Sequence, residues 1–313
     1  MNRHDDPQVI YQTNLILSEK LKDSLIRTKS KAHVIFSSSS QELQDNLYGK
    51  SKRYAREILT NWAKTSGGTF TGLIIPNVFG PFCKPYYNSV IATFCSQLIN
   101  NEEPKILIDS EINLIYIDEL VKLIINCIDL KTGNEELKIA HSSTYKVSEI
   151  LQILKRFKND YIVNGTIPIL ASTYELNLFN TFRSYINYKN HFPIKYQQNI
   201  DSRGSFTEII RINSGGQVSY STTKVGITRG NHFHTRKIER FSVIKGKALI
   251  QLRKIGTKET YDFYLSGDQP AYVDMPVWYT HNIKNIGDDD LYTMFWINEF
   301  FISNDPDTYF ENV

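Results

Sequence analysis

Glycine is missing from the first 48 residues of the chain, and the first glycine is Gly49. Nowhere do the glycines follow the G-x-G-x-x-G spacing. In dinucleotide-binding domains, a turn of that kind lets backbone amides and a helix N-terminus hold the cofactor pyrophosphate. The sequence therefore lacks the usual device for binding a dinucleotide, whatever else its N-terminal half contains.

The chain also has few cysteines, little net charge and no long apolar run. Cys83, Cys95 and Cys127 show no C-x-x-C spacing, which favours reduced thiols that pack in the interior of a cytoplasmic protein. The net charge of +3 is not gathered in a basic block, so no nucleic-acid partner is expected. No apolar run approaches the roughly 20 residues of a membrane span, and residues 1–7 lack the apolar core of a signal peptide. We expect an ordinary soluble, cytoplasmic protein with no membrane partner, and 313 residues give room for two domains.

The N-terminal half alternates strand and helix patterns. Short apolar runs predict buried strands at 31–36 and 70–75. Apolar residues at helical spacing predict helices at 8–30, 48–65, 86–100 and 117–130. Such alternation is typical of a parallel sheet with helices on its faces.

Ser39, Tyr48 and Lys52 form a candidate catalytic group in this half. Tyr48 and Lys52 are one helical turn apart, so their side chains share a face of the helix. A nearby ammonium group lowers the pKa of a phenol, which can then exchange a proton with a carbonyl oxygen during hydride transfer. A serine at the end of the preceding strand can hydrogen-bond the same oxygen. Two further Tyr-x-x-x-Lys pairs begin at Tyr185 and Tyr220, but only the first pair follows a strand that ends in serines.

Four short motifs stand out here: Phe36-Ser-Ser-Ser, Tyr48-Gly-Lys-Ser-Lys52, Pro76-Asn-Val-Phe-Gly-Pro81 and Ile115-Tyr-Ile-Asp118-Glu-Leu. Together they resemble the extended short-chain dehydrogenase/reductase family, in its nucleotide-sugar branch. The longer strings 44–52 and 83–95 are similar to one bifunctional group in that branch, which makes a UDP-linked 6-deoxy-talosamine for capsular polysaccharide.

The resemblance implies roles for six residues. It assigns catalysis to Ser39, Tyr48 and Lys52, and contact with the cofactor to Tyr48 and Lys52. It assigns contact with the sugar nucleotide to Asn77, Asn88 and Ser89. The alternative for Asn77, Asn88 and Ser89 is that they are ordinary loop and helix-cap residues.

The chain departs from this family at its beginning. Residues 1–7 resemble the loop after the family's fourth strand. Two βαβ units that share a strand take up roughly 60 residues, so we expect an incomplete Rossmann-like domain that lacks its N-terminal βαβ part. A fragment, a mis-called start or decay of the reductase half would each give this pattern. We expect NADP(H) binding by this chain to be poor or absent, although Tyr48 and Lys52 remain.

From about residue 196 the pattern changes to short strands separated by closely spaced turns. Amphipathic helices are expected before it, at 146–158 and 174–188, and the polar stretch 188–193 predicts a domain boundary. The expected strands are 217–221, 240–244, 248–253, 261–265, 271–274 and 291–297. This pattern is typical of an antiparallel sandwich or barrel. We therefore predict an α/β domain at 1–192 and an all-β domain at 193–313.

A candidate metal site lies in the stretch from Gly226 to Gly246. His232 and His234 are separated by one residue, so on a strand both side chains point to the same side. Glu239 follows across a short turn, and His281 lies on a later strand. Two or three imidazoles and a carboxylate suit zinc, and iron or manganese would also accept them. An isolated H-x-H pair would more simply be two polar strand residues.

The spacing Gly226-x5-His232-x-His234-x4-Glu239-x6-Gly246 resembles the first sequence motif of the cupins. The second cupin motif is matched in Gly267, Pro276, His281 and Asn285, although Gly267 and Pro276 are further apart than usual. Trp278 stands where that motif usually has glycine. The resemblance implies a C-terminal cupin β-barrel whose metal ligands are His232, His234, Glu239 and His281.

The stretch Asp201-Ser-Arg203-Gly204 with Glu208 is similar to the start of the cupin-type 4-keto-sugar nucleotide 3,5-epimerases. The matching arginine there pairs with the diphosphate, which suits a guanidinium fork, so the resemblance implies substrate binding by Arg203. A structural turn arginine is the alternative. The end of the chain, 296–310, resembles the bifunctional capsular group, whose members are expected to be homodimers.

These resemblances imply an enzyme that epimerises C3 of a UDP-4-keto-6-deoxy-N-acetylhexosamine in the cupin half. The other half would reduce C4 with NADPH in an intact family member. Tyr220, Lys237 and Tyr279 are candidates for the base that removes the C3 proton. The rival hypotheses are a metal-dependent cupin oxygenase or isomerase on an N-terminal scaffold, and an inactive truncated chain.

Overall fold

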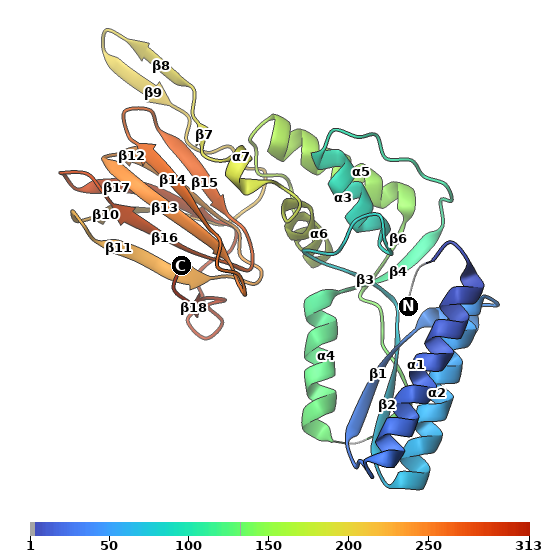
Figure 1. Ribbon diagram of the computed structural model, residues 1–313. Coiled ribbons are helices and arrows are strands. Elements are labelled where there is room, and N and C mark those ends of the chain that lie inside the picture. Colours follow the sequence, from blue (N-terminus) through green and yellow to red (C-terminus); the bar gives the residue numbers. More distant parts are fainter. Residues whose placement is uncertain (1–3, 132) are drawn as a thin grey trace. The chain divides into compact units, whose positions relative to one another are not determined.

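The computed structural model describes residues 4–131 and 133–313, which form two compact units (Figure 1). The first unit contains Met1–Gln97 and Glu103–Gln152, and the second contains Leu98–Glu102 and Ile153–Val313. The chain therefore leaves the first unit within helix α5 (Val147–Phe157), before the predicted domain boundary at 192/193. Within the described residues, no helix combines the length and apolar character that a membrane crossing requires.

A parallel sheet in the order β1-β2-β5 lies at the centre of the first unit. Its strands are β1 (His33–Ser39), β2 (Thr69–Ile75) and β5 (Asn134–Lys138). All of β2 after Thr69 is buried, as expected for the middle strand of a parallel sheet. Helix α1 (Pro7–Arg27) packs along α2 (Leu47–Ser66), and α4 (Ile117–Leu130) lies apart from this pair (Figure 1). The predicted β–α–β alternation is confirmed in these elements.

A second small sheet, in the order β3-β4-β6, was not predicted from the sequence. It contains β3 (Asn77–Phe79), β4 (Glu111–Tyr116) and β6 (Ser143–Lys146). Ile115 and Leu120 pack in one apolar core with Leu73 and Ile75 of the parallel sheet, so the two sheets share an interior. The helices after these strands are α3 (Val90–Ile99) and α5 (Val147–Phe157). The predicted helix at 86–100 begins at Val90 instead, because residues 81–88 form the loop before it.

The helix ends follow from local sequence. The Asp6 side chain accepts a hydrogen bond from Gln8 N at the start of α1, where Pro7 has no amide hydrogen to satisfy. The Asn46 side chain caps α2 by accepting from Gly49 N, and Gly67 ends that helix in the left-handed conformation. The α2 N-terminus is thus fixed directly before Tyr48.

The second unit is dominated by two five-stranded sheets whose pairings are antiparallel (Figure 1). In sheet order, the first contains β10 (Gln217–Thr223), β17 (Leu291–Ile297), β12 (Glu239–Lys245), β15 (Ala271–Met275) and β7 (Ile194–Lys195). The second contains β14 (Thr260–Ser266), β13 (Lys247–Lys254), β16 (Tyr279–Asn285), β11 (Thr228–Phe233) and β18 (Tyr309–Phe310). All six strands predicted for this half are present, so the all-β prediction is confirmed.

Short elements complete this unit. A hairpin is formed by β8 (Gln198–Asp201) and β9 (Gly204–Thr207). The predicted helix 174–188 is divided, because α6 (Thr173–Arg183) ends at the cap residue Ser184 and α7 (Tyr188–His191) begins after a turn. A π-helical turn at Lys158–Val163 of this unit and a 3-10 turn at Ser40–Leu43 of the first unit are the remaining helical segments among the described residues.

Candidate functional sites

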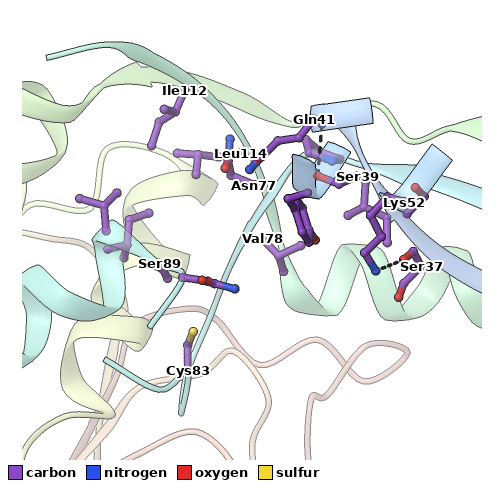
Figure 2. Close-up of a pocket in the computed structure, with 17 residues that line it drawn as sticks. Ser37, Ser39, Gln41, Lys52, Asn77, Val78, Cys83, Ser89, Ile112 and Leu114 are labelled. Atoms are coloured by element: carbon purple, nitrogen blue, oxygen red, sulfur yellow. Dashed lines mark hydrogen bonds between the residues drawn. The ribbon is translucent and has the colours of Figure 1, made fainter. Parts of the chain in front are cut away.

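One cavity of the first unit, of about 550 Å³, gathers residues that the sequence motifs singled out (Figure 2). The ends of β1 and β2, the first turns of α2 and the loop before α3 surround it. Its lining includes all six predicted catalytic and sugar-nucleotide residues: Ser39, Tyr48, Lys52, Asn77, Asn88 and Ser89. Residues from three separate motifs therefore meet at one site.

Lys52 and Tyr48 share a face of α2, as their spacing predicts. The Lys52 Nζ atom donates to the carbonyl oxygen of Ser37 at 2.9 Å and lies 5.8 Å from the centre of the Tyr48 ring. Figure 2 shows Lys52, Ser37 and Ser39 on one side of the cavity. The lysine is thus anchored to the end of β1, on the side where the serines lie.

The pKa of Tyr48 does not move in the direction expected from the sequence. Burial raises it, and a hydrogen bond with Ser39 offsets only part of that effect. Burial also lowers the pKa of Lys52, against the influence of Glu42. The predicted lowering of the phenol pKa is therefore wrong for this arrangement, because burial outweighs the hydrogen bond with Ser39 and Lys52 is not among the groups that shift this pKa. Tyr48 stays protonated at neutral pH and can donate a proton from the cavity wall.

Two of the residues predicted to contact the sugar nucleotide, Asn77 and Ser89, also form hydrogen bonds within the protein. Asn77 Nδ2 donates to the carbonyl oxygen of Asn113 at 3.1 Å, which fixes the amide beside the cavity. Ser89 Oγ accepts from Ala92 N at 3.2 Å, the geometry of a helix cap at α3. Cys83, expected to be a packing residue, is only partly buried and lines the same cavity. Cys83 carries no sequence signal that separates it from the buried Cys95.

A second candidate site lies in the β-rich unit, where His232, His234, Glu239 and His281 converge. Each of the four offers one ligand atom, and these atoms lie within 4.8 Å of one another. Oε2 of Glu239 is 3.1 Å from Nε2 of His234 and 3.2 Å from Nε2 of His281. The structure thus brings together all four residues that the spacing predicted as ligands.

Strand pairing explains this convergence. His232 on β11 pairs with His281 on β16, after a bulge that follows Gly230. The bulge places an extra residue in β11 and re-aims the following side chains. Glu239 begins β12, which belongs to the other five-stranded sheet. The two sheets therefore contribute ligands from facing sides.

The donor set fits a divalent cation. Apart from one another, Nε2 of His234, Nε2 of His281 and Oε2 of Glu239 have no polar partner among the described residues, although all three atoms are buried. Buried polar atoms without partners are rare in folded proteins. Two imidazoles and a carboxylate at such spacing match the ligands of zinc, and His232 offers a third imidazole.

Electrostatics of the cluster also suit a cation. Burial, with a smaller contribution from the charge of His281, lowers the pKa of His232 to about 4. Burial opposes ionisation of Glu239, but hydrogen bonds from His234 and His281 outweigh it and hold the carboxyl pKa well below its usual range. Burial also opposes the charge on His234, whose pKa is nevertheless raised by Glu239. The cluster therefore presents a charged carboxylate and a neutral His232.

Arg203 is not part of this cluster. It lies at the tip of the β8–β9 hairpin with 88% of its side chain exposed, and its Nη2 atom is 2.6 Å from Oδ2 of Asp201. The role in substrate binding implied by resemblance stays a prediction.

The three candidate bases lie in different surroundings. Tyr220 pairs with Met294, whereas Glu239 pairs with Ile297, three residues further along β17. Because successive side chains point to opposite faces of a strand, Tyr220 lies on the face away from Glu239, and its candidacy is wrong. Lys237 is buried, with Nζ donating to the carbonyl oxygen of Pro306 at 2.7 Å.

Tyr279 lies two residues before His281 on β16 and is buried. Its ring is 5.6 Å from that of Tyr188, and burial raises its pKa to about 12. A phenol with such a pKa stays protonated at neutral pH, so Tyr279 is poorly suited to remove a proton.

The two units match two known families. Residues 1–140 match the NAD dependent epimerase/dehydratase family, and residues 199–309 match the polysaccharide biosynthesis C-terminal domain. The protein is therefore of the class that joins a sugar-nucleotide epimerase or reductase domain to a C-terminal domain of polysaccharide biosynthesis.

Relatives that match nearly the whole chain identify its family more specifically. The chain is 33% identical over 311 residues to the UDP-2-acetamido-2,6-beta-L-arabino-hexul-4-ose reductase of Pseudomonas aeruginosa, covering 99% of this chain and 83% of that protein. It is 40% identical to the capsular polysaccharide assembling protein CapF of Staphylococcus aureus, with a TM-score of 0.59, covering 95% of this chain and 80% of that one. A CapF structure with the inhibitor 3-isopropenyl-tropolone is 35% identical, with a TM-score of 0.55, covering 99% of this chain and 91% of that one. The chain belongs to the family of these CapF-type proteins.

Proposed function

We propose that the C-terminal unit epimerises C3 of a UDP-4-keto-6-deoxy-N-acetylhexosamine, and that the N-terminal cavity binds the same sugar nucleotide for reduction at C4. The observation that carries this proposal is the convergence of His232, His234, Glu239 and His281 on one point. The relatives support the substrate class, since one is a reductase of a UDP-linked hexulose. We further propose that the strands after residue 193 form a cupin barrel and that the enzyme is a cytoplasmic homodimer.

Zinc is the metal that we propose for this cluster. His232, His234, Glu239 and His281 would hold it, with iron or manganese as substitutes where they are more available. When bound, the ion supplies a positive charge that stabilises the enolate of a 4-keto sugar, which makes the C3 proton acidic. The charged Glu239, whose Oε2 atom is buried, and the neutral His232 support this assignment.

The residues around the cluster would perform the rest of the epimerisation. The face of β12 that carries Glu239 also carries Phe241, whose ring lies 5.6 Å from that of His281. Such an apolar wall excludes water from the reacting carbon and slows loss of the enolate by side reactions. Inversion then requires loss of the C3 proton from one face and return of a proton to the other. Arg203 would bind the diphosphate.

In the N-terminal cavity, Tyr48 would donate a proton to the C4 oxygen while Ser39 hydrogen-bonds it. A raised phenol pKa supports the role of donor, since Tyr48 is protonated at neutral pH. Lys52, Asn77, Asn88 and Ser89 would orient the sugar and the cofactor. NADPH supplies the hydride when it is bound, and we propose that this chain binds it weakly.

The test is solvent exchange in deuterated water with the UDP-4-keto sugar. We expect deuterium at C3 with the wild type and with Tyr48→Phe, and none with His232→Ala. A wild type that leaves C3 unlabelled would refute the epimerase. Exchange that survives His232→Ala but is lost in Tyr48→Phe would move the reaction to the N-terminal cavity. Fluorescence titration with NADPH tests the cofactor prediction, which sub-micromolar binding would contradict.

A further inference from the structure

We propose that Asp307 is a positioning residue that orients His234 toward the metal. The inference rests on the metal site of the proposed function and extends it to the end of the chain. Asp307 lies 73 residues after His234 and is buried, with only 2% of its surface exposed. Its backbone φ of 41° is in the left-handed region, which aspartate and asparagine adopt more readily than most residues.

The backbone carbonyl of Asp307 faces the His234 ring. Its oxygen lies 2.5 Å from Nδ1 of His234. A carbonyl can only accept a hydrogen bond, so Nδ1 carries the hydrogen in this contact. Neutral His234 then has its lone pair on Nε2, the atom that is 3.1 Å from Oε2 of Glu239. The contact therefore selects the tautomer that can bind a metal at the centre of the cluster.

The carboxylate of the same residue fixes the turn that joins the ligands His234 and Glu239. Oδ1 accepts from the backbone N and the Oγ1 of Thr235, at 3.0 and 2.7 Å. Oδ2 accepts from the backbone N atoms of Arg236 and Lys237, both at 3.0 Å. One side chain thus satisfies three consecutive backbone donors between the two ligands.

Three flanking contacts attach the surrounding segment. Arg236 pairs with Asp305 at 2.9 Å and with Glu299 at 3.1 Å. Lys237 Nζ donates to the carbonyl oxygen of Pro306 at 2.7 Å. The Arg236–Asp305 pair is at the surface, with 63% of the aspartate side chain exposed, and such pairs contribute little. Asp307 is therefore the buried anchor of this segment.

Asp307→Asn tests the proposal because it keeps the size of the side chain and tolerates the left-handed backbone. An amide offers one acceptor oxygen and turns an NH2 group toward backbone donors, so the turn and the carbonyl that faces His234 lose their anchor. We expect zinc affinity, measured by competition with a chromogenic chelator, to fall about 10–100-fold. Asp305→Asn is the matched control and should stay within about twofold of the wild type, because its ion pair is exposed.

Two further measurements distinguish a role of Asp307 in positioning His234 from a general loss of stability. The visible spectrum of the cobalt-substituted protein should change in Asp307→Asn and not in Asp305→Asn, because it reports ligand geometry. If Asp307→Asn does not fold, Thr235→Val removes the bond from Oγ1 to Oδ1 and keeps the bond from the backbone N, so it should weaken zinc binding in the same direction by less. Unchanged zinc affinity and an unchanged cobalt spectrum in Asp307→Asn would overturn the proposal while leaving the epimerase intact. A wild type that binds no divalent metal would overturn both.

Discussion

Arg240 and Asp274 form a buried, bidentate ion pair. Arg240 lies on the face of β12 opposite to Glu239, and Asp274 lies on the neighbouring strand β15. Nε of Arg240 is 2.7 Å from Oδ1 of Asp274, and Nη2 is 2.9 Å from Oδ2. The Tyr161 hydroxyl donates to Oδ2 at 2.7 Å, and the Arg240 guanidinium lies 3.8 Å from the centre of the Tyr272 ring. Strand β12 thus carries the candidate metal ligand Glu239 on one face. Its other face carries Arg240, whose charge is paired with Asp274.

Removing only one partner of this pair should be costly. Arg240→Met leaves the Asp274 carboxylate buried without its counter-charge, and we expect the free energy of unfolding to fall by about 3–5 kcal/mol. The double variant Arg240→Met/Asp274→Leu should lose less, because neither charge of this pair is then left buried without its partner. Urea unfolding followed by circular dichroism measures both. A single variant as stable as the double one would show that the pair is not energetically coupled.

The same pair predicts how stability depends on pH. Burial raises the pKa of Asp274, but Arg240, with smaller contributions from Arg183 and the Tyr161 hydroxyl, outweighs burial and leaves it below its ordinary value of 3.8. A carboxyl whose pKa is lowered by folding stabilises the protein above its unfolded pKa, and this contribution is lost as pH falls through the folded pKa. Between pH 5 and about 2, the wild type should therefore lose more stability than Arg240→Met/Asp274→Leu. Parallel acid-limb slopes in the urea midpoints would contradict this.

The sequence was most informative where the regular repeat of a strand or a helix determines the direction of neighbouring side chains. Alternation on a strand placed His232 and His234 on one side, and helical spacing placed Tyr48 and Lys52 on one face. Both expectations rest on local backbone geometry, and the structure confirms them.

Long-range pairing could not be predicted in the same way. Tyr220 was a candidate base, but its face is set by the register with Met294, which strand sequences alone do not fix. Asp307 gives no sequence signal, because its partners at 234–237 lie some 70 residues earlier. The sign of the Tyr48 pKa shift likewise depends on burial, which follows from the packed cavity rather than from the Tyr-x-x-x-Lys spacing.

Gly49 on α2 lies against the backbone of Gln41, and this close contact helps to shape the N-terminal cavity. A Cβ atom at this position would lie 2.0 Å from the carbonyl oxygen of Gln41, which lines the cavity next to Tyr48. Alanine normally stabilises a helix over glycine by about 0.5–1 kcal/mol, but overpacking costs about 1–3 kcal/mol. We therefore expect Gly49→Ala to be destabilising and to weaken binding of UDP-sugars by the cavity.

Gly215→Ala is the control for Gly49→Ala, since no atom lies within 4 Å of the added Cβ. We expect its thermal midpoint to be unchanged or slightly raised, because alanine restricts the unfolded chain more than glycine. Differential scanning fluorimetry with and without a UDP-sugar measures both effects. Equal midpoints and equal ligand shifts in the two variants would show that α2 tolerates the contact with Gln41.

His281 and Tyr220 provide the sharpest comparison for the metal site. His281→Ala removes a fully buried imidazole whose Nε2 atom is 3.2 Å from Oε2 of Glu239. Loss of a ligand should weaken zinc binding by more than the roughly 10–100-fold that loss of an outer-shell partner causes. Tyr220→Phe removes one hydroxyl from the opposite face of the sheet and should leave both zinc affinity and solvent exchange at C3 unchanged. Metal content after dialysis, measured by mass spectrometry, separates the two variants, and a Tyr220→Phe protein that loses zinc would contradict the strand register on which its exclusion depends.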